Sequence, residues 1–149
     1  DVYKSQVYDY IIDIKIKDIM SAPVVVNEET SVYDATVHIF LNDVGTLFVE
    51  NKEVLVGAIS RKDLLKIAIG GTDIHKVPVG IIMTRMPNII CIEREDSAYL
   101  AAKKIIEHEV DSLPVIERME RDGREVMKIV GKVSKTNITK LFLKLGEND

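Results

Sequence analysis

The octet GAISRKDL at residues 57–64 decides the fold, because it returns as GKVSKTNI at residues 131–138. In both octets an apolar stretch of strand type runs into Ser-x-x-Asp or Ser-x-x-Asn. A hydroxyl residue followed three positions later by a short polar side chain is typical of the first turn of a helix. The chain therefore passes from a strand into a helix at two places with one pattern, which indicates an internal duplication.

The repetition continues upstream of both octets. Residues 31–49 and 97–115 share seven identical amino acids out of nineteen. Further upstream, Ile19-Met20-Ser21 matches Ile82-Met83-Thr84, and a proline follows each at positions 23 and 87. The second copy is longer by a charged segment at 117–128, where Asp122-Gly123 predicts a hairpin turn. We interpret this segment as a solvated surface hairpin; the alternative is an arm that binds a partner.

Each copy predicts the same order of elements: a short strand, a helix, two strands and a closing helix. The short strands are expected at 24–26 and 89–92, and the paired strands at 47–49 with 54–59 and 113–116 with 126–133. Helical spacing predicts which apolar residues face the core: Val32, Ala35, Ile39 and Phe40 in the first copy, Ala98, Ala101, Ala102, Ile105 and Ile106 in the second, and Ile138, Leu141, Phe142 and Leu145 in the last helix.

The expected organisation is a lead-in at 1–15, a first repeat at 16–70, a linker at 71–78 and a second repeat at 79–146. Gly70, Gly71 and Pro78 mark the linker. In the lead-in, Val7, Tyr10, Ile11 and Ile14 have helical spacing, although the isoleucines at 12, 14 and 16 also alternate as in a strand. We favour a helix followed by a strand.

Composition excludes several classes of protein. The 149 residues are 46% apolar and 30% charged, which argues against a disordered chain. No apolar run approaches the ~20 residues of a membrane span. The single cysteine, Cys91, excludes a disulfide framework and a multi-cysteine zinc site, and it fits a cytoplasmic protein.

A formal charge of −4 argues against nucleic-acid binding by this segment itself. The chain starts at Asp1 without a signal peptide, so we expect a piece of a longer protein.

The repeated Ile-Met-Ser/Thr segment, the paired strands and the octets resemble CBS (cystathionine β-synthase) domains, and the two copies together resemble a tandem CBS pair, or Bateman module. The resemblance covers roughly residues 16–145. The stretch 70–90 and the helical lead-in are similar to the sensor half of the gluconeogenesis catabolite repressors of Bacillus type, in which a helix-turn-helix domain precedes the pair.

The resemblance implies an α+β fold of two βαββα repeats related by a pseudo-twofold axis in one compact module. It also implies a homodimer and adenosine ligands between the repeats: ADP or ATP foremost, with AMP or S-adenosylmethionine as alternatives. DNA would be bound only through the absent N-terminal domain, and no membrane is involved.

The residues themselves support part of this expectation. The Ser60 hydroxyl can cap a helix or bond a ligand, and the Asp63 carboxylate can accept both hydroxyls of a ribose. Arg61 and Lys62 can meet phosphates. The alternative for the same four residues is a plain helix cap with a solvated basic pair.

Two clefts follow from the resemblance. The first would be lined by Ser60, Arg61, Asp63, Thr84, Arg85, Pro87, Ile89, Val110, Asp111, Ser112 and Leu113, with the backbone at 88–90 reading adenine. The second would be lined by Ser134, Lys135, Asn137, Ser21, Pro23, Val24, Val44, Gly45, Thr46 and Leu47. Because the Asn137 amide carries no charge, its ribose hydrogen bonds should be weaker than those of Asp63. We therefore expect one preferred site at Asp63 and a weak or empty second site.

No residues assemble into a catalytic or metal site by spacing. His38, His75 and His108 are scattered, Cys91 lies in an apolar strand, and Tyr33 and Tyr99 fit packing positions. The sequence therefore predicts a regulatory, non-enzymatic module that senses adenine nucleotides and controls an attached effector, such as the DNA-binding domain of a repressor. The alternatives are a regulatory subunit of an enzyme or transporter and a ligand-free dimerisation scaffold.

Overall fold

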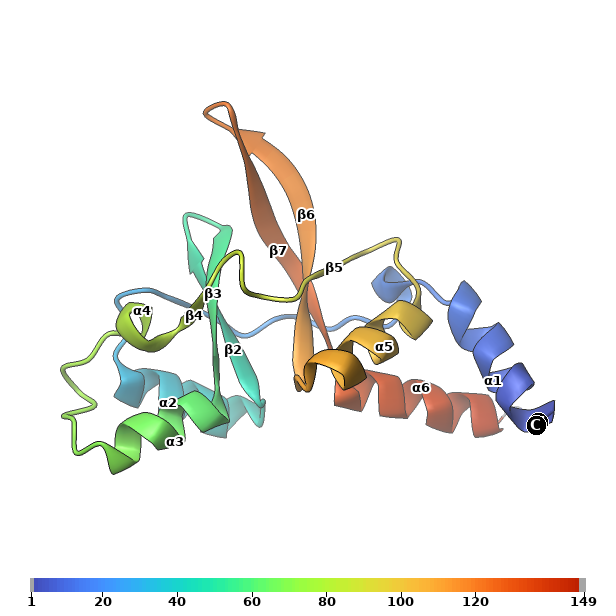
Figure 1. Ribbon diagram of the computed structural model, residues 1–149, viewed down its shortest axis with the longest axis horizontal. Helices are drawn as coiled ribbons and strands as arrows, with labels where there is room; N and C mark the ends of the chain where they lie inside the picture. Colours follow the sequence, from blue (N-terminus) through green and yellow to red (C-terminus); the bar gives the residue numbers. More distant parts are fainter. Residues whose placement is uncertain (1, 148–149) are drawn as a thin grey trace. The chain divides into compact units, whose positions relative to one another are not determined.

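A computed structural model describes the backbone of residues 2–147 and the side chains of residues 7–147. The predicted mixed α+β fold is confirmed (Figure 1). The helices are α1 (Val2–Asp13), the 3-10 helix η1 (Ile16–Asp18), α2 (Val32–Asn42), α3 (Arg61–Ile69), α4 (Val79–Ile82), α5 (Ala98–His108) and α6 (Lys135–Glu147). The strands are β1 (Val25–Asn27), β2 (Thr46–Asn51), β3 (Val54–Ser60), β4 (Thr84–Arg85), β5 (Ile92–Glu93), β6 (Ser112–Arg121) and β7 (Arg124–Ser134).

The chain divides into two compact units whose boundaries cut across the repeats. Unit 1 comprises the chain up to Ala22, Ile90–Glu117 and the chain from Val130 onward. Unit 2 comprises Pro23–Ile89 and Arg118–Ile129. Each unit therefore holds most of one repeat together with the segment that leads into the other repeat, and unit 2 also holds the outer part of the β6–β7 hairpin.

In unit 2, β1 pairs in parallel with β2, and β2 pairs antiparallel with β3, so that Thr46 faces Ser60. Helices α2 and α3 pack on these strands. The core is aliphatic, and it includes two residues from the lead-in of the second repeat. Its members are Val26, Val32, Ala35, Ile39, Val44, Leu47, Val49, Ile59, Leu64, Val79 and Met83.

In unit 1, β5 pairs in parallel with β6, and α5 and α6 supply the helical side of the core. Ile16, from the lead-in of the first repeat, is fully buried there. A second cluster joins Ile11 of α1 to Ala98 of α5 and Leu141 of α6. The main cluster consists of Ile16, Ile92, Ala101, Ile105, Leu113, Val115, Val133 and Ile138.

Helices α2 and α5 both begin with a serine cap. The Ser31 hydroxyl accepts a hydrogen bond from the Asp34 N–H at 3.0 Å, and Ser97 accepts one from the Leu100 N–H at 3.0 Å. Both caps satisfy an N–H group that the first turn of a helix leaves without an internal partner.

Some side chains that were predicted to lie in the core are exposed. Phe40 is 82% exposed and Ile106 is 76% exposed, so neither belongs to the core. Both follow a buried isoleucine by one position, which turns their side chains about 100° away from it. Phe142 is exposed as well.

The lead-in also differs in detail. The helix is confirmed as α1, and among its residues 7–13 Ile11 is buried, whereas Val7 and Tyr10 are exposed. The expected strand after it reduces to a single bridge between Lys15 and Ser97, followed by η1. The strand expected at 89–92 is confirmed only from Ile92 onward.

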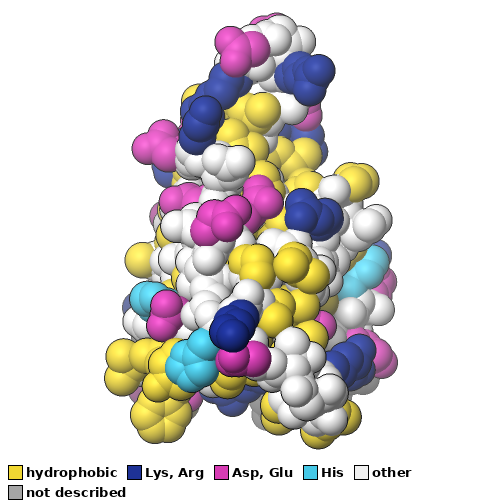
Figure 2. Space-filling view, turned by 90° about the vertical axis from the view of Figure 1, so that its left-hand side faces the viewer, with side chains coloured by type: hydrophobic (Ala, Val, Ile, Leu, Met, Phe, Trp, Pro, Cys, Tyr) yellow, Lys and Arg dark blue, Asp and Glu magenta, His cyan; other side chains and the backbone are white. Residues whose placement is uncertain are grey.

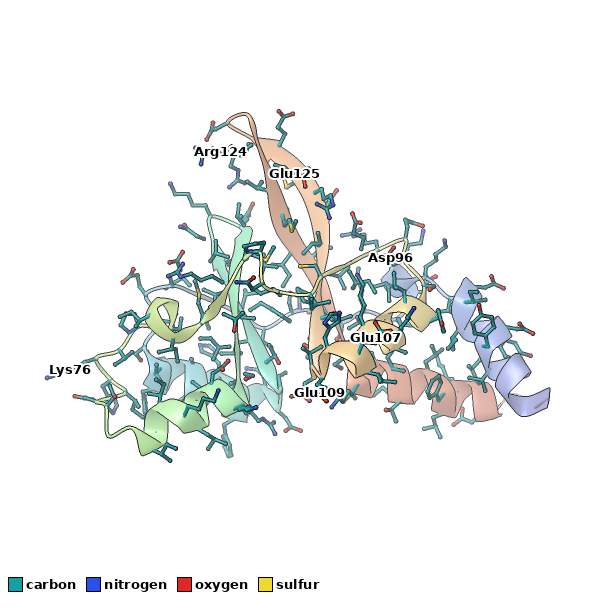
Figure 3. All side chains as sticks on the ribbon, viewed as in Figure 1. Lys76, Asp96, Glu107, Glu109, Arg124 and Glu125 are labelled. Atoms are coloured by element: carbon teal, nitrogen blue, oxygen red, sulfur yellow. The ribbon has the colours of Figure 1, made fainter. Side chains whose placement is uncertain are left out.

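The charged insertion forms the β6–β7 hairpin, with Asp122 and Gly123 at positive φ in its turn, as predicted. Arg118 and Glu125 form an ion pair across the two strands, and Glu125 stands near the tip (Figure 3). The Arg121 guanidinium donates to the Lys52 carbonyl at 2.7 Å within unit 2. Among the described residues, no helix is long and apolar enough to cross a bilayer.

Candidate functional site

The start of α3 in unit 2 is a reciprocal helix cap. Ser60 ends β3, and its hydroxyl oxygen accepts a hydrogen bond from the Asp63 N–H at 3.3 Å. In return, Asp63 Oδ2 accepts from the Ser60 N–H at 2.9 Å and from the Ser60 hydroxyl at 3.1 Å. The predicted cap is therefore present, and it uses only one of the two carboxylate oxygens of Asp63.

The segment leading into the second repeat lies beside this cap. In β4, Thr84 faces Ala58 and Arg85 faces Gly57 of β3. A Cβ on Gly57 would stand 2.3 Å from Met83 Sδ, so a larger residue there would force the Met83 side chain to move. Thr84 and Arg85 thereby come to the end of β3 that carries Ser60, while Pro87 and Ile89 follow in the next turn of unit 2.

Six of the residues expected at the second cleft also lie in unit 2: Pro23, Val24, Val44, Gly45, Thr46 and Leu47. Thr46 faces Ser60 across β2 and β3, and the Gly45 carbonyl accepts from the Arg61 N–H at 3.1 Å. The Val24 carbonyl accepts from the Phe48 N–H at 3.1 Å, at the start of β1. Gly45 and Thr46 are thus neighbours of the Ser60 cap.

Both guanidinium groups expected at phosphates have acceptors inside unit 2. Arg61 Nε donates to the Val44 carbonyl at 3.1 Å, and its Nη2 lies 3.4 Å from Asp43 Oδ1. Arg85 Nη2 donates to the Gly80 carbonyl at 2.6 Å, and its Nη1 lies 3.9 Å from Glu28 Oε2. Both ion pairs are at the surface, where such pairs are worth about 1 kcal/mol or less. An incoming phosphate could therefore draw either cation away from its carboxylate.

Unit 1 repeats the cap with an amide in place of the carboxylate. Asn137 Oδ1 accepts from the Ser134 N–H at 2.8 Å and from the Ser134 hydroxyl at 2.7 Å. Asn137 Nδ2 donates to the Ile19 carbonyl at 2.8 Å and lies 3.5 Å from the Ser21 hydroxyl. Only this orientation of the amide places its oxygen on donors and its nitrogen on acceptors.

Ser21 is held in unit 1 by its backbone as well. Its N–H donates to the Lys132 carbonyl at 3.0 Å, and the Lys132 N–H donates back at 2.8 Å. Partial burial lowers the pKa of the Lys132 ammonium from its ordinary value. A Cβ on Gly131 would meet Met20 Sδ at 2.8 Å, which matches the contact between Gly57 and Met83 in unit 2.

The remaining predicted site residues are also in unit 1. Lys135 follows Ser134 as Arg61 follows Ser60, and its ammonium lies 3.3 Å from Asp111 Oδ1. The Asp111 carbonyl accepts from the Lys135 N–H at 3.0 Å. Val110, Ser112 and Leu113 flank this acceptor at the start of β6.

Sequence reasoning missed the acceptors that hold these polar groups. Asp43 and Glu28 carry no motif, and the Ile19 carbonyl belongs to the backbone. The recurrence of Met with a glycine in the facing octet was the available signal for the two close contacts.

A hollow of about 740 Å³ lies elsewhere in unit 2, along β1 and the β2–β3 turn. Glu28, Glu29, Glu50 and Glu53 line it, with His38 and Lys52. Figure 2, which views the molecule from the left of Figure 1, shows several Asp and Glu side chains together on this side. Such an excess of carboxylates repels a phosphorylated ligand.

The other residues weighed from the sequence have structural contacts. Tyr33 stacks on His75 with ring centroids 4.3 Å apart, and Tyr99 meets Tyr8 edge-on at 5.1 Å. Lys104 Nζ donates to the Cys91 carbonyl at 2.8 Å. Within residues 2–147, no group of three or more His, Cys, Asp or Glu side chains could hold a metal ion.

Comparison with known proteins identifies relatives of the chain. The model of the CBS domain family matches residues 16–70 and 74–144. Transcriptional repressor CcpN of Bacillus subtilis (strain 168) is 50% identical over 137 residues, which are 91% of this chain and 63% of the repressor. The chain thus spans less than two thirds of the length of that relative.

Two solved structures are similar over most of the chain. The CBS domain pair of protein MJ0100, in complex with 5′-methylthioadenosine and S-adenosyl-L-methionine, is 25% identical with a TM-score of 0.70, over 86% of this chain and 98% of that one. CBSX2 in complex with AMP is 26% identical with a TM-score of 0.69, over 89% of this chain and 98% of that one.

Proposed function

This chain belongs to the CBS domain family, and on that premise we propose that its unit 2 binds an adenine nucleotide beside Asp63 and thereby controls an attached effector. The observation that carries the proposal is the helix cap of α3. It leaves Asp63 Oδ1 without a hydrogen bond among the described residues, at the helix that follows the strand paired with β4. The proposed role is regulatory and not enzymatic.

A carboxylate oxygen in this position suits the hydroxyls of a ribose. Asp63 is partly exposed, and its orientation is fixed because Oδ2 is held by Ser60. Two hydroxyls donating to a charged oxygen form stronger hydrogen bonds than they would to a neutral acceptor. The N–H groups at the start of α3 also favour negative charge nearby.

The same surface supplies groups for the other parts of a nucleotide. Pro87 and Ile89, which follow β4, offer apolar contacts to a base. Arg61 and Arg85 offer guanidinium groups to phosphates. To bind them, Arg61 would leave Asp43 and Arg85 would leave Glu28. The ligands named for MJ0100 and CBSX2 all contain adenosine, which supports a ligand of this class. The two arginines favour ADP or ATP over S-adenosylmethionine.

The effector is proposed by analogy with the related repressor. CcpN is a transcriptional repressor, and this chain spans 63% of its length, so the control of DNA binding would be exerted on a further domain. Such a role belongs to the cytoplasm. A regulatory subunit of an enzyme or transporter is the alternative.

A second copy of the chain is the proposed partner of the exposed apolar helix surface in unit 2. Neighbouring helices α2 and α3 leave Phe40, Leu41, Leu65 and Ile69 between 66% and 88% exposed. Exposed apolar clusters of this kind mark association surfaces. We expect Phe40→Asp to lower the dimer fraction in sedimentation velocity, whereas Met119→Asp on the hairpin should not. A wild-type chain that stays monomeric at high concentration would contradict this proposal.

Calorimetric titration with ATP, ADP, AMP and S-adenosylmethionine tests the ligand. The wild-type chain should bind at least one adenine nucleotide with saturation, and Asp63→Ala should lose that binding. The matched control is Asp34→Ala, because Asp34 occupies the same third position of its helix, α2, behind the Ser31 cap.

The outcomes separate the candidate functions. Binding lost in Asp63→Ala but kept in Asp34→Ala supports the nucleotide sensor. Equal binding by both variants would move the site away from Asp63. If none of the four compounds binds, the ligand-free dimerisation scaffold becomes the better account.

A further inference from the structure

We propose that the Asn137 side chain closes the unit 1 copy of the ligand site, so that the chain takes up one nucleotide and not two. The inference rests on the proposed function for the identity of the ligand. It adds the device that distinguishes the two copies: an amide that binds residues 19–21 of the same chain, called below the lead-in segment, where a carboxylate would receive a ribose.

All the hydrogen-bonding capacity of the Asn137 amide is used inside unit 1. The amide oxygen has two lone pairs, and the Ser134 N–H and hydroxyl take both. The amide nitrogen has two hydrogens, which face the Ile19 carbonyl at 2.8 Å and the Ser21 hydroxyl at 3.5 Å. A ribose hydroxyl would find no open group on this side chain.

Asp63 is in the same cap and has a free oxygen. Its Oδ2 receives the Ser60 N–H and hydroxyl, as Asn137 Oδ1 receives those of Ser134. Its Oδ1 carries no hydrogen, so it cannot donate to a backbone carbonyl as the Asn137 amide does. The two side chains differ in one group, a carboxylate oxygen in Asp63 and an amide NH₂ in Asn137. This group therefore decides whether the cap side chain binds the lead-in segment or keeps an oxygen available to a ligand.

The lead-in segment is held at three points once the amide is in place. Met20 lies against Gly131, and Ser21 exchanges two backbone hydrogen bonds with Lys132. The Ile19 carbonyl accepts a hydrogen bond from the Asn137 amide nitrogen. The first two contacts have counterparts in unit 2, at Met83 with Gly57 and at β4 with β3. Of these three contacts, the hydrogen bond from the Asn137 amide to the Ile19 carbonyl has no counterpart in unit 2 among the described residues.

The test variant is Asn137→Asp. A carboxylate keeps the cap, as Asp63 shows, but its second oxygen would face the Ile19 carbonyl, acceptor against acceptor. The lead-in is then released and the oxygen becomes available to a ribose. Calorimetry with ADP should give one site per chain in the wild type and two in Asn137→Asp, with Asp63→Asn as the variant that lacks the unit 2 site.

Hydrogen exchange without nucleotide tests the contact itself. Asn137→Ala removes the amide and adds no ligand group, so it should still bind one ADP. It should speed exchange of the Ser21 N–H by roughly fivefold, the equivalent of one ordinary hydrogen bond. The Thr84 region of unit 2 is the internal control, and circular dichroism checks that each variant is folded.

The results decide the inference independently of the Asp63 site. Two ADP sites in the wild type, or one ADP site in both the wild type and Asn137→Asp, would overturn it, as would unchanged exchange at Ser21 in Asn137→Ala. A wild type that binds no ADP together with an Asn137→Asp variant that binds one would uphold the closure while refuting the site at Asp63. If neither protein binds ADP, both proposals fail.

Discussion

At the scale of single residues, Gly57 shows how one side chain controls a contact between segments that are distant in sequence. A Cβ there would stand 2.3 Å from Met83 Sδ, and Met83 is buried. The repeated glycines in the two octets therefore leave room for the facing methionine side chains. The sequence shows the glycines and the methionines, but only the fold shows that they meet.

We predict that Gly57→Ala lowers the free energy of unfolding by about 1–3 kcal/mol, because the added methyl overpacks the contact with Met83. Urea denaturation measures the change. Gly146→Ala is the control: nothing lies within 4 Å of its Cβ, and alanine favours its helix, α6. Equal stability of both variants would contradict the close contact.

Asp43 allows a second prediction at this scale, and it depends on the proposed function. Asp43→Asn removes the charge that holds the Arg61 guanidinium at 3.4 Å. Arg61 is then freer to meet a phosphate, so ADP affinity should rise, by up to about fivefold given the small worth of surface ion pairs. Titration of both proteins with ADP checks this, and Asp122→Asn on the hairpin is the control. A weaker affinity would show that Arg61 does not reach the ligand.

At the scale of elements, α1 is part of the core of unit 1. Ile11 is 7% exposed and packs with Ala98 and Leu141, whereas Ile12, the next residue, is 40% exposed. We predict that Ile11→Ala costs about 2–4 kcal/mol of unfolding free energy, as for other buried isoleucines, and that Ile12→Ala costs far less. Denaturation curves of the two variants give the comparison, and similar losses would mean that α1 does not pack as described.

The ion pair between Lys17 and Glu95 connects η1 to the turn before α5 within unit 1. The Lys17 ammonium donates to Glu95 Oε1 at 3.0 Å, and this hydrogen bond lowers the pKa of Glu95 and raises that of Lys17. The stabilisation from Glu95 is present above its unfolded pKa and is lost as the pH falls through the lower folded pKa. That from Lys17 is present below its unfolded pKa and is lost as the pH rises through the raised folded pKa.

We therefore predict that Lys17→Met raises the pKa of Glu95 toward its ordinary value, as measured by NMR titration of the carboxyl carbon. Lys103→Met, which breaks the ion pair with Glu107, is the control. An unchanged Glu95 pKa in Lys17→Met would contradict the hydrogen bond.

The positions of helices and strands were predicted better than the side of each helix that is buried. The helices and paired strands of both repeats and the Asp122-Gly123 turn follow from local propensity and spacing, and the structure confirms them, whereas the strand expected at 89–92 begins only at Ile92. Phe40 and Ile106 were placed in the core because apolar residues beside a core stripe extend it in the sequence pattern. Which edge of such a stripe is covered depends on tertiary packing, which no local pattern contains.

The candidate site was predictable to the same degree. The Ser-x-x-Asp and Ser-x-x-Asn caps follow from residue type, and the resemblance to CBS pairs indicated that Thr84 and Ser21 belong near them. The binding of Arg61 to Asp43, and of Asn137 to a backbone carbonyl, depends on side-chain rotamers and on backbone groups. Neither can be read from a single sequence.

At the scale of the whole molecule, nucleotide binding should stabilise the units unequally. At a hundredfold excess over Kd, a ligand raises the stability of the species that binds it by about 2.7 kcal/mol. We predict that ADP slows hydrogen exchange at the β3–α3 junction and in β4, and leaves the β7–α6 junction of unit 1 nearly unchanged. Equal protection at both junctions would contradict the single site at Asp63.

The make-up of the two units also determines how the chain can be divided. Val79 and Met83 complete the core around the first repeat, and Ile16 completes the core around the second. A fragment trimmed to one repeat therefore lacks buried side chains that only the other fragment carries. A chain cut in the linker near Gly71 loses nothing, and the two pieces together hold every core residue. We therefore expect each piece to fold poorly until its complement is supplied, as the halves of a split-protein reporter do.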